Sequence, residues 1–192
     1  GTDFLSNTAN FGGAMYAYVN ATNGSGTAST ADFSLTNSTV FSNNDANTAG
    51  GAVYVEVKDG AMSTPAVDGT NFSSNTAGSG GALYLHSKST DGSGTPSLID
   101  ASIGSNTTFS QNTASSRGGA VMIEGQGGGE ARPDISGVTF SSNSAEHGGA
   151  VEVLSDGTDG SGTPSQAQPS FTDVKFLDNE ASGATDGSGN PI

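Results

Sequence analysis

A short pattern, Phe-x-x-Asn-x-Ala, occurs six times in this chain. Its phenylalanines are Phe4, Phe41, Phe72, Phe109, Phe140 and Phe176. Five copies are followed within a few residues by Gly-Gly-Ala, and the sixth by the related Ser182-Gly183-Ala184. A motif that recurs every few tens of residues is typical of repeat proteins, in which each unit buries its apolar face only against its neighbours. The pattern therefore predicts a solenoid.

The spacing between the motif phenylalanines alternates, at 37, 31, 37, 31 and 36 residues. The longer units carry an additional Gly/Ser-rich loop, which recurs at intervals of 68 residues as Gly24–Gly26, Gly92–Gly94 and Gly160–Gly162. Insertions at one point of a repeat lie on one side of a solenoid. We therefore expect these loops to line one side of the molecule.

The composition is poor in apolar residues: 32% of the 192 residues are hydrophobic, 7% are aromatic and 30 are glycine. Such values border on those of disordered chains. A disordered chain, however, has no need to place Phe, Asn and Ala in one pattern six times. Because the pattern runs from end to end without a break, we expect residues 1–192 to form a single β-solenoid domain, as a segment or repeat unit of a longer surface protein or filament.

The run after each Gly-Gly-Ala alternates in character. Its first and third positions are apolar in all five copies: Met15 and Ala17, Val53 and Val55, Leu83 and Leu85, Val121 and Ile123, and Val151 and Val153. The positions between them vary and include charged residues. Apolar residues at a period of two predict a strand with one buried face, and no segment of the chain has a helical period.

The motif predicts the remaining strands and turns of each unit. A proline often precedes the Phe strand, as at Pro65, Pro96 and Pro133, which suits the first residue of a strand. We expect each Phe to point inward and stack on the Phe of the next coil, and each Asn to bond backbone amides at a turn and repeat as a ladder. The prediction is an all-β fold, a parallel β-helix of about six coils and roughly 29 Å in length.

The pairing of Phe-x-x-Asn with Gly-Gly-Ala and a following aliphatic residue resembles the repeat of chlamydial polymorphic membrane proteins. The six Phe/Asn pairs and five Gly-Gly-Ala triplets carry this resemblance over nearly the whole chain. It implies a pectin-lyase-like, right-handed parallel β-helix that is secreted as an autotransporter passenger and acts as an adhesin. It also implies an extracellular or cell-surface location.

The net charge is −14, from five Lys and Arg against nineteen Asp and Glu. Such a surface repels nucleic acid and anionic lipid, so neither is expected as a partner. No apolar run approaches the roughly 20 residues of a membrane span, so we expect no membrane insertion by this segment. The absence of cysteine excludes disulfides, thiol catalysis and thiolate metal sites.

One column of the strand after Gly-Gly-Ala is aromatic. Tyr16, Tyr54 and Tyr84, followed by Met122, occupy a position that is predicted to face outward. An exposed aromatic stripe can bind a receptor or a glycan, but the same stacking can simply strengthen a sheet. Both interpretations remain open at this stage, and the stripe is the candidate binding site.

Other candidate sites are weaker. Asp-rich turns, at Asp91–Gly94, Asp156–Gly162 and Asp186–Gly189, could bind Ca²⁺, but their spacing matches neither an EF-hand nor the nonapeptide calcium repeat, so solvated turns and no cofactor are expected. His86 and His147 have no ligand-spaced neighbour in sequence, so no metal site is expected.

Parallel β-helices also occur in polysaccharide lyases and glycosidases, which need clustered carboxylates and usually a basic side chain. The five basic residues of this chain occupy different points of the repeat: Lys58, Lys88, Arg117, Arg132 and Lys175. We therefore expect no enzyme and no catalytic residues, and favour a structural or adhesive extracellular module.

The two ends of the chain suggest a partner. Several units read Pro-x-aliphatic-x-Gly-x-x-Phe, and Pro191-Ile192 followed by Gly1-Thr2-Asp3-Phe4 nearly recreates this phrase. We therefore expect copies to continue head to tail. The spacing from Phe176 to the Phe4 of a next copy would be only 20 residues, 11 short of the shorter unit, which predicts an incomplete coil at the junction.

Overall fold

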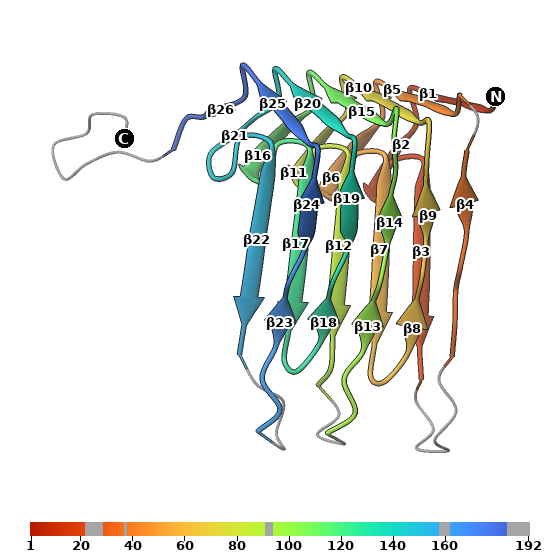
Figure 1. The fold of residues 1–192 in the computed structure, drawn as a ribbon, viewed down its shortest axis with the longest axis vertical. Coiled ribbons are helices and arrows are strands. Elements are labelled where there is room, and N and C mark those ends of the chain that lie inside the picture. The colour runs from red at the N-terminus through yellow and green to blue at the C-terminus, as the bar shows by residue number, and fades with distance from the viewer. Residues whose placement is uncertain (22–28, 37, 91–93, 158–161, 184–192) are drawn as a thin grey trace, which may run out of the picture.

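The computed structural model describes residues 1–21, 29–36, 38–90, 94–157 and 162–183. These residues form short β-strands and no helix, and every strand pairing is parallel. The strands follow one another around successive coils, and equivalent strands of adjacent coils lie side by side (Figure 1). The prediction of an all-β, parallel β-helix of about six coils is confirmed.

The coils build five parallel sheets, which we call sheets A to E. Sheet A carries the motif Phe and contains β1 (Asp3–Leu5), β5 (Val40–Ser42), β10 (Asn71–Ser73), β15 (Thr108–Ser110), β20 (Thr139–Ser141) and β25 (Lys175–Leu177). Sheet B carries the motif Ala and contains β2 (Thr8–Phe11), β6 (Asp45–Ala49), β11 (Thr76–Ser79), β16 (Thr113–Arg117), β21 (Ser144–Ala145) and β26 (Glu180–Ala181).

Sheet C follows the Gly-Gly-Ala turn and contains β3 (Met15–Asn20), β7 (Val53–Lys58), β12 (Leu83–Lys88), β17 (Val121–Gln126) and β22 (Val151–Asp156). Sheet D contains β8 (Met62–Ser63), β13 (Leu98–Ile99), β18 (Glu130–Ala131) and β23 (Gln166–Ala167). Sheet E contains β4 (Ser34–Leu35), β9 (Ala66–Val67), β14 (Ser102–Ile103), β19 (Asp134–Ser136) and β24 (Ser170–Thr172).

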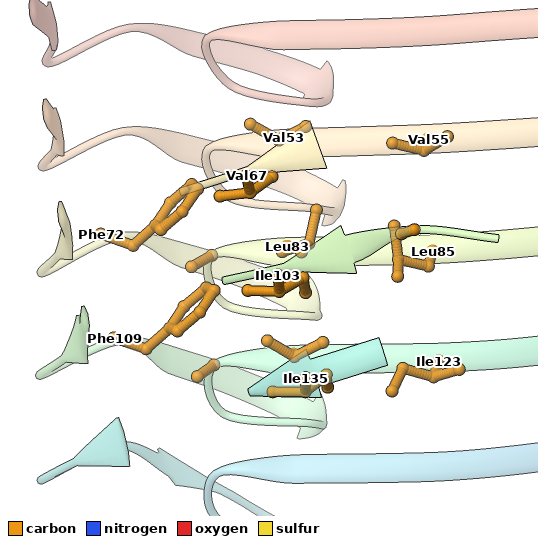
Figure 2. Close-up of a cluster of buried hydrophobic side chains, with 14 of the residues drawn as sticks. Val53, Val55, Val67, Phe72, Leu83, Leu85, Ile103, Phe109, Ile123 and Ile135 are labelled. Carbon is orange, nitrogen blue, oxygen red and sulfur yellow. The ribbon is translucent and has the colours of Figure 1, made fainter. Parts of the chain in front are cut away.

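The motif phenylalanines form one inward column. Each pairs in register with the Phe of the next coil, and their ring centroids are 4.5 to 5.1 Å apart with nearly parallel planes. The four interior rings are fully buried. They pack beside the inward aliphatic side chains of sheets C and E, as Figure 2 shows for Phe72 and Phe109. The predicted Phe column is therefore confirmed.

The motif asparagines form the predicted ladder. The Asn75 side-chain amide donates both to Oδ1 of Asn112 in the next coil, at 3.0 Å, and to the Phe41 carbonyl in the preceding coil, at 3.1 Å. The residue before each motif Asn has a positive φ of 52 to 56°, for example Ser74, which turns the chain sharply between sheets A and B. The four interior Asn side chains are completely buried, and the ladder satisfies their polar atoms.

The glycines of Gly-Gly-Ala have two different roles. The first has a positive φ in every copy, for example 61° at Gly118, a conformation that a residue with a Cβ adopts at a cost. The second lies where neighbouring backbones meet: a Cβ at Gly119 would overlap the Gly149 carbonyl oxygen of the next coil. These two glycines thus let the chain turn into sheet C at the same point of each coil.

The sixth coil departs from the repeat. Among the described residues, sheets A and B have six strands, whereas sheets C and E have five. The Gly/Ser-rich loops expected on one side, around Gly24–Gly26, Gly92–Gly94 and Gly160–Gly162, lie largely outside the described residues, as do Pro191 and Ile192. In the part of the chain that is described, no helix has the length and apolar character of a membrane span.

Candidate binding face

The outer face of sheet C holds the candidate site. Its first outward column contains Tyr16, Tyr54, Tyr84, Met122 and Glu152, and its second contains Tyr18, Glu56, His86, Glu124 and Leu154. Between these columns, Val53, Val55 and their equivalents point into the core and are buried in the central coils. The predicted facing of the strand is therefore confirmed.

The prediction of an exposed tyrosine stripe is wrong for its central residue, Tyr54. Tyr16 is 46% exposed, but Tyr54 is only 4% exposed and Tyr84 is half-buried. Tyr54 is not inside the coil; it is covered by neighbouring rings on the outer face. Its ring centroid lies 5.1 Å from that of Tyr16, 5.2 Å from that of Tyr84 and 5.5 Å from that of Phe11.

Phe11 is the residue that the sequence-based interpretation missed. It ends β2 in sheet B, at a position where the other coils have Ala49, Ser79 and Arg117. Because sheet B turns into sheet C at the next residues, the Phe11 side chain packs against Tyr54 and covers it. Met122, the continuation of the column, is buried as well. Stacking within the sheet is thus the observed role of Tyr54.

The tyrosine hydroxyls bond diagonally to the next coil. The Tyr16 hydroxyl donates to the Glu56 carboxylate, and the Tyr84 hydroxyl donates to the Glu124 carboxylate. The Tyr54 hydroxyl lies 2.9 Å from Nδ1 of His86. Each bond links the first outward column to the second, one coil further on, so the network connects adjacent coils across their outer surface.

Burial and the glutamates together hold the tyrosines protonated. Desolvation is the main cause that raises the pKa of Tyr16, Tyr54 and Tyr84 well above the usual value for a phenol. Hydrogen bonding to Glu56 raises the pKa of Tyr16 further, and hydrogen bonding to Glu124 does the same for Tyr84. The phenols of Tyr16 and Tyr84 therefore act as hydrogen-bond donors at neutral pH, whereas the direction of the Tyr54 bond depends on the His86 tautomer.

His86 is less isolated than the sequence suggests. The parallel register places it between Glu56 and Glu124, which come from the preceding and following coils. Burial lowers the pKa of His86, although the charges of Glu124 and Glu56 oppose this shift. A neutral imidazole can accept the Tyr54 hydroxyl at Nδ1, whereas Nε2 of His86 is buried without a hydrogen-bond partner among the described residues.

Arg117 forms an ion pair on the outer face of sheet C, at the end of this face that is nearer to the last coil. It ends β16, and its guanidinium forms an ion pair with Glu152 in the next coil. It also lowers the pKa of Tyr84, against the larger effects that raise it. The carboxylates of Glu56, Glu124 and Glu152 are thus each held by a neighbouring side chain.

Three aromatic rings remain exposed at one end of this face. Phe11, Tyr16 and Tyr18 are 42%, 46% and 48% exposed. The Phe11 and Tyr16 centroids are 6.1 Å apart, and those of Tyr16 and Tyr18 are 6.0 Å apart. We call these three residues the aromatic cluster. Tyr18 lies two positions after Tyr16 on the same face of β3, and the register places it beside Glu56 of the next coil.

Metal-ligating side chains are not gathered in the described part of the chain, and a cavity lies beside its last coil. No group of three His, Asp or Glu side chains there could hold a metal ion. Asp91, Asp159 and Asp186, of the proposed Ca²⁺ turns, lie outside the described residues. A cavity of about 360 Å³ lies beside the last coil, between Val151 and Phe176, and Asp178 is the one ionisable residue among the described residues that line it.

Comparison with known families gives three matches, to the Chlamydia polymorphic membrane protein repeat, at residues 38–56, 69–86 and 106–124. Each stretch runs from sheet A through the Gly-Gly-Ala turn into sheet C: β5 to β7, β10 to β12 and β15 to β17. No curated protein and no solved structure matches the chain. The chain thus contains three stretches that match the repeat of Chlamydia polymorphic membrane proteins, and each forms the same part of a coil in a parallel β-helix.

Proposed function

We propose that this chain is an extracellular structural and adhesive module, a stretch of a surface fibre or filament in which copies continue head to tail. The observation that carries this proposal is the polarity of the asparagine ladder. In each interior step, the backbone N–H and the side-chain amide of one Asn donate to Oδ1 of the Asn in the following coil. The ladder therefore has a different chemical group at each end.

The two ends of the ladder are complementary. In the first coil, the backbone N–H and the side-chain amide of Asn7 donate to Oδ1 of Asn44. In each later asparagine of the ladder, the atom equivalent to Asn7 Oδ1 accepts the bonds from the preceding coil. In the last coil, Oδ1 of Asn179 accepts from the backbone N–H and the side-chain amide of Asn143. In each earlier asparagine of the ladder, the backbone N–H equivalent to that of Asn179 donates to the following coil. One end thus offers an acceptor and the other a donor, which favours contacts with a single polarity.

The phenylalanine column also supports a contact between the last coil of one copy and the first coil of the next. Phe176 stacks on Phe140 with one face, yet it is 51% exposed, whereas the interior rings are fully buried. Leu177 and Leu5, its counterpart in the first coil, are also exposed. A further coil that carried the motif would cover these side chains and add a pair to the column.

The join is expected to need one further segment. If β1 of a second copy stacks on β25, sheets A and B continue from one copy into the next. Among the described residues, sheets C and E have one strand fewer than sheets A and B, so the last coil would leave a gap there. The cavity between β22 and Phe176 lies at this step. The 11-residue shortfall in the sequence supports the same expectation, and we expect the incomplete part of the coil at sheets C to E.

The matched repeat supports an extracellular setting, because its description is that of a membrane protein. The net charge of −14 gives the module a strongly acidic surface. Among the described residues, the cavity beside the last coil is lined by one carboxylate, that of Asp178, whereas a glycosidase needs a pair. A stiff, acidic, hydrogen-bonded solenoid is suited to reach and display.

Sedimentation velocity over a range of concentrations tests the proposal. We expect the parent to form elongated oligomers whose population rises with concentration, and Phe176→Asp to remain monomeric because it places a charge in the contact. Ser115→Asp adds the same charge to an exposed position in a middle coil and should behave as the parent. A parent that stays monomeric at high concentration, or equal association of both variants, would overturn the proposal.

A further inference from the structure

We infer that the aromatic cluster, together with the Glu56 carboxylate, is a binding site for the cationic side chains of a basic protein partner. This site lies on the side of the solenoid, on the outer face of β3 and β7. The site lies at the first-coil end of sheet C, whereas the proposed end contact is formed by sheets A and B, and the site adds a lateral binding function to the structural one.

The first argument is the geometry of the rings. Phe11, Tyr16 and Tyr18 form one continuous patch, with centroid separations of about 6 Å and planes tilted by 31° and 48°. One face of the Tyr16 ring stacks on the buried Tyr54 of the next coil, with the ring centroids 5.1 Å apart and the planes 11° apart. The three rings therefore pack against one another and present exposed ring faces, and the faces of aromatic rings attract lysine and arginine side chains.

The second argument is the position of a carboxylate at the rim. Glu56 adjoins Tyr18 in the register of β3 and β7 and accepts the Tyr16 hydroxyl through Oε2. A guanidinium or ammonium group over the rings could therefore reach both a ring face and a carboxylate. Such combined contacts are stronger than contact with a ring alone.

The third argument is the charge of the whole molecule. With nineteen acidic and five basic residues, the chain draws basic partners from a distance and repels acidic ones. Lys58 lies two positions from Glu56 on the same face and pairs in register with Lys88, so the long-range attraction comes from the charge of the whole molecule. A neutral sugar could stack on the rings, but it would gain little from this negative potential, so a cationic protein segment fits the site better.

The test uses a fluorescent peptide of alternating Arg and Gly, titrated into the full chain, with a Glu/Gly peptide as the charge-reversed control. We expect the Tyr16→Leu/Tyr18→Leu double variant to bind the Arg peptide about tenfold more weakly, and Glu56→Gln about threefold more weakly with a smaller dependence on salt. The matched controls are Phe171→Leu and Glu180→Gln, exposed residues of the last two coils, which should stay within about twofold of the parent. Circular dichroism establishes that all variants remain folded.

Three outcomes would overturn the inference. If the controls weaken binding as much as the cluster variants do, the attraction is only that of the overall charge. If the double variant binds like the parent, the rings take no part. If a neutral oligosaccharide binds in a manner that needs Tyr16 and Tyr18 but is insensitive to salt, the site is a glycan site. A monomeric parent in sedimentation would leave this inference unaffected, so the two proposals fail separately.

Discussion

Asn75 and Asn112 are 37 residues apart in the chain, yet their side chains lie one above the other in adjacent coils, joined by a 3.0 Å hydrogen bond in the fully buried ladder. Oδ1 of Asn112 also accepts the backbone N–H of Asn75, while its amide donates to the Phe72 carbonyl and to Asn143. One side chain thus satisfies polar groups in both neighbouring coils.

Replacing Asn112 by Ala should therefore destabilise the fold by about 3 kcal/mol or more, because several buried groups lose their partners together. Urea unfolding followed by circular dichroism measures this change. Asn71→Ala is the control, since Asn71 is exposed and accepts one bond from Thr108. Similar losses in the two variants would contradict the assigned role of the ladder.

The phenylalanine column should show a gradient from the middle to the end. Phe72→Ala and Phe109→Ala each remove a fully buried ring and should cost about 3–5 kcal/mol. Phe176→Ala removes a ring that is half exposed and should cost clearly less. Thermal melts of the three variants under one condition give the comparison, and a middle variant that melts within a degree or two of the parent would rule out this packing.

Gly119→Ala should be strongly destabilising although it adds only a methyl group. The added Cβ would overlap the Gly149 carbonyl oxygen, which is backbone and cannot move without displacing the next coil. We expect a loss of about 2 kcal/mol or more in chemical denaturation. Ser115→Ala, an exposed position in the same coil, is the control and should change stability little.

His86 should make the outer face of sheet C sensitive to acid. Burial lowers its pKa in the folded chain, so the folded state favours the neutral imidazole. The stability that this neutral form contributes is present above the unfolded pKa of about 6.5 and is lost as the pH falls from there through the lower pKa of the folded chain. Between pH 7.5 and pH 5, the parent should therefore lose more stability than His86→Gln. Identical pH profiles of melting temperature would show that His86 is not linked to folding.

The sequence predicted the features in which identical residues stack on identical residues. Phe72 on Phe109 and Asn75 on Asn112 follow from the motif, because equal spacing in a solenoid places equal residues in one column. The alternation of Val53 and Val55 with Tyr54 likewise predicted which side of the strand faces inward. These features depend on the period of the repeat, which is visible in a single sequence.

What the sequence did not predict depends on contacts between unlike residues of different coils. Tyr54 is buried because Phe11, at a position outside the motif, packs over it. His86 seemed isolated because Glu56 and Glu124 lie 30 and 38 residues away in the chain, and only the register brings them beside it. Such contacts require the strand pairing to be known residue by residue.

Cysteine cross-linking tests the head-to-tail continuation most directly, because the chain has no cysteine of its own. Leu5 and Leu177 occupy one column of sheet A, at its first and last strands, and both are exposed. If β25 of one copy pairs with β1 of the next, the Leu5→Cys/Leu177→Cys double variant should form a ladder of disulfide-linked multimers under mild oxidation, since Cα atoms on adjacent strands lie within disulfide reach. The single variants, which can link only like ends, should stay monomeric. A double variant that remains monomeric, or single variants that dimerise just as readily, would contradict the continuation with one polarity.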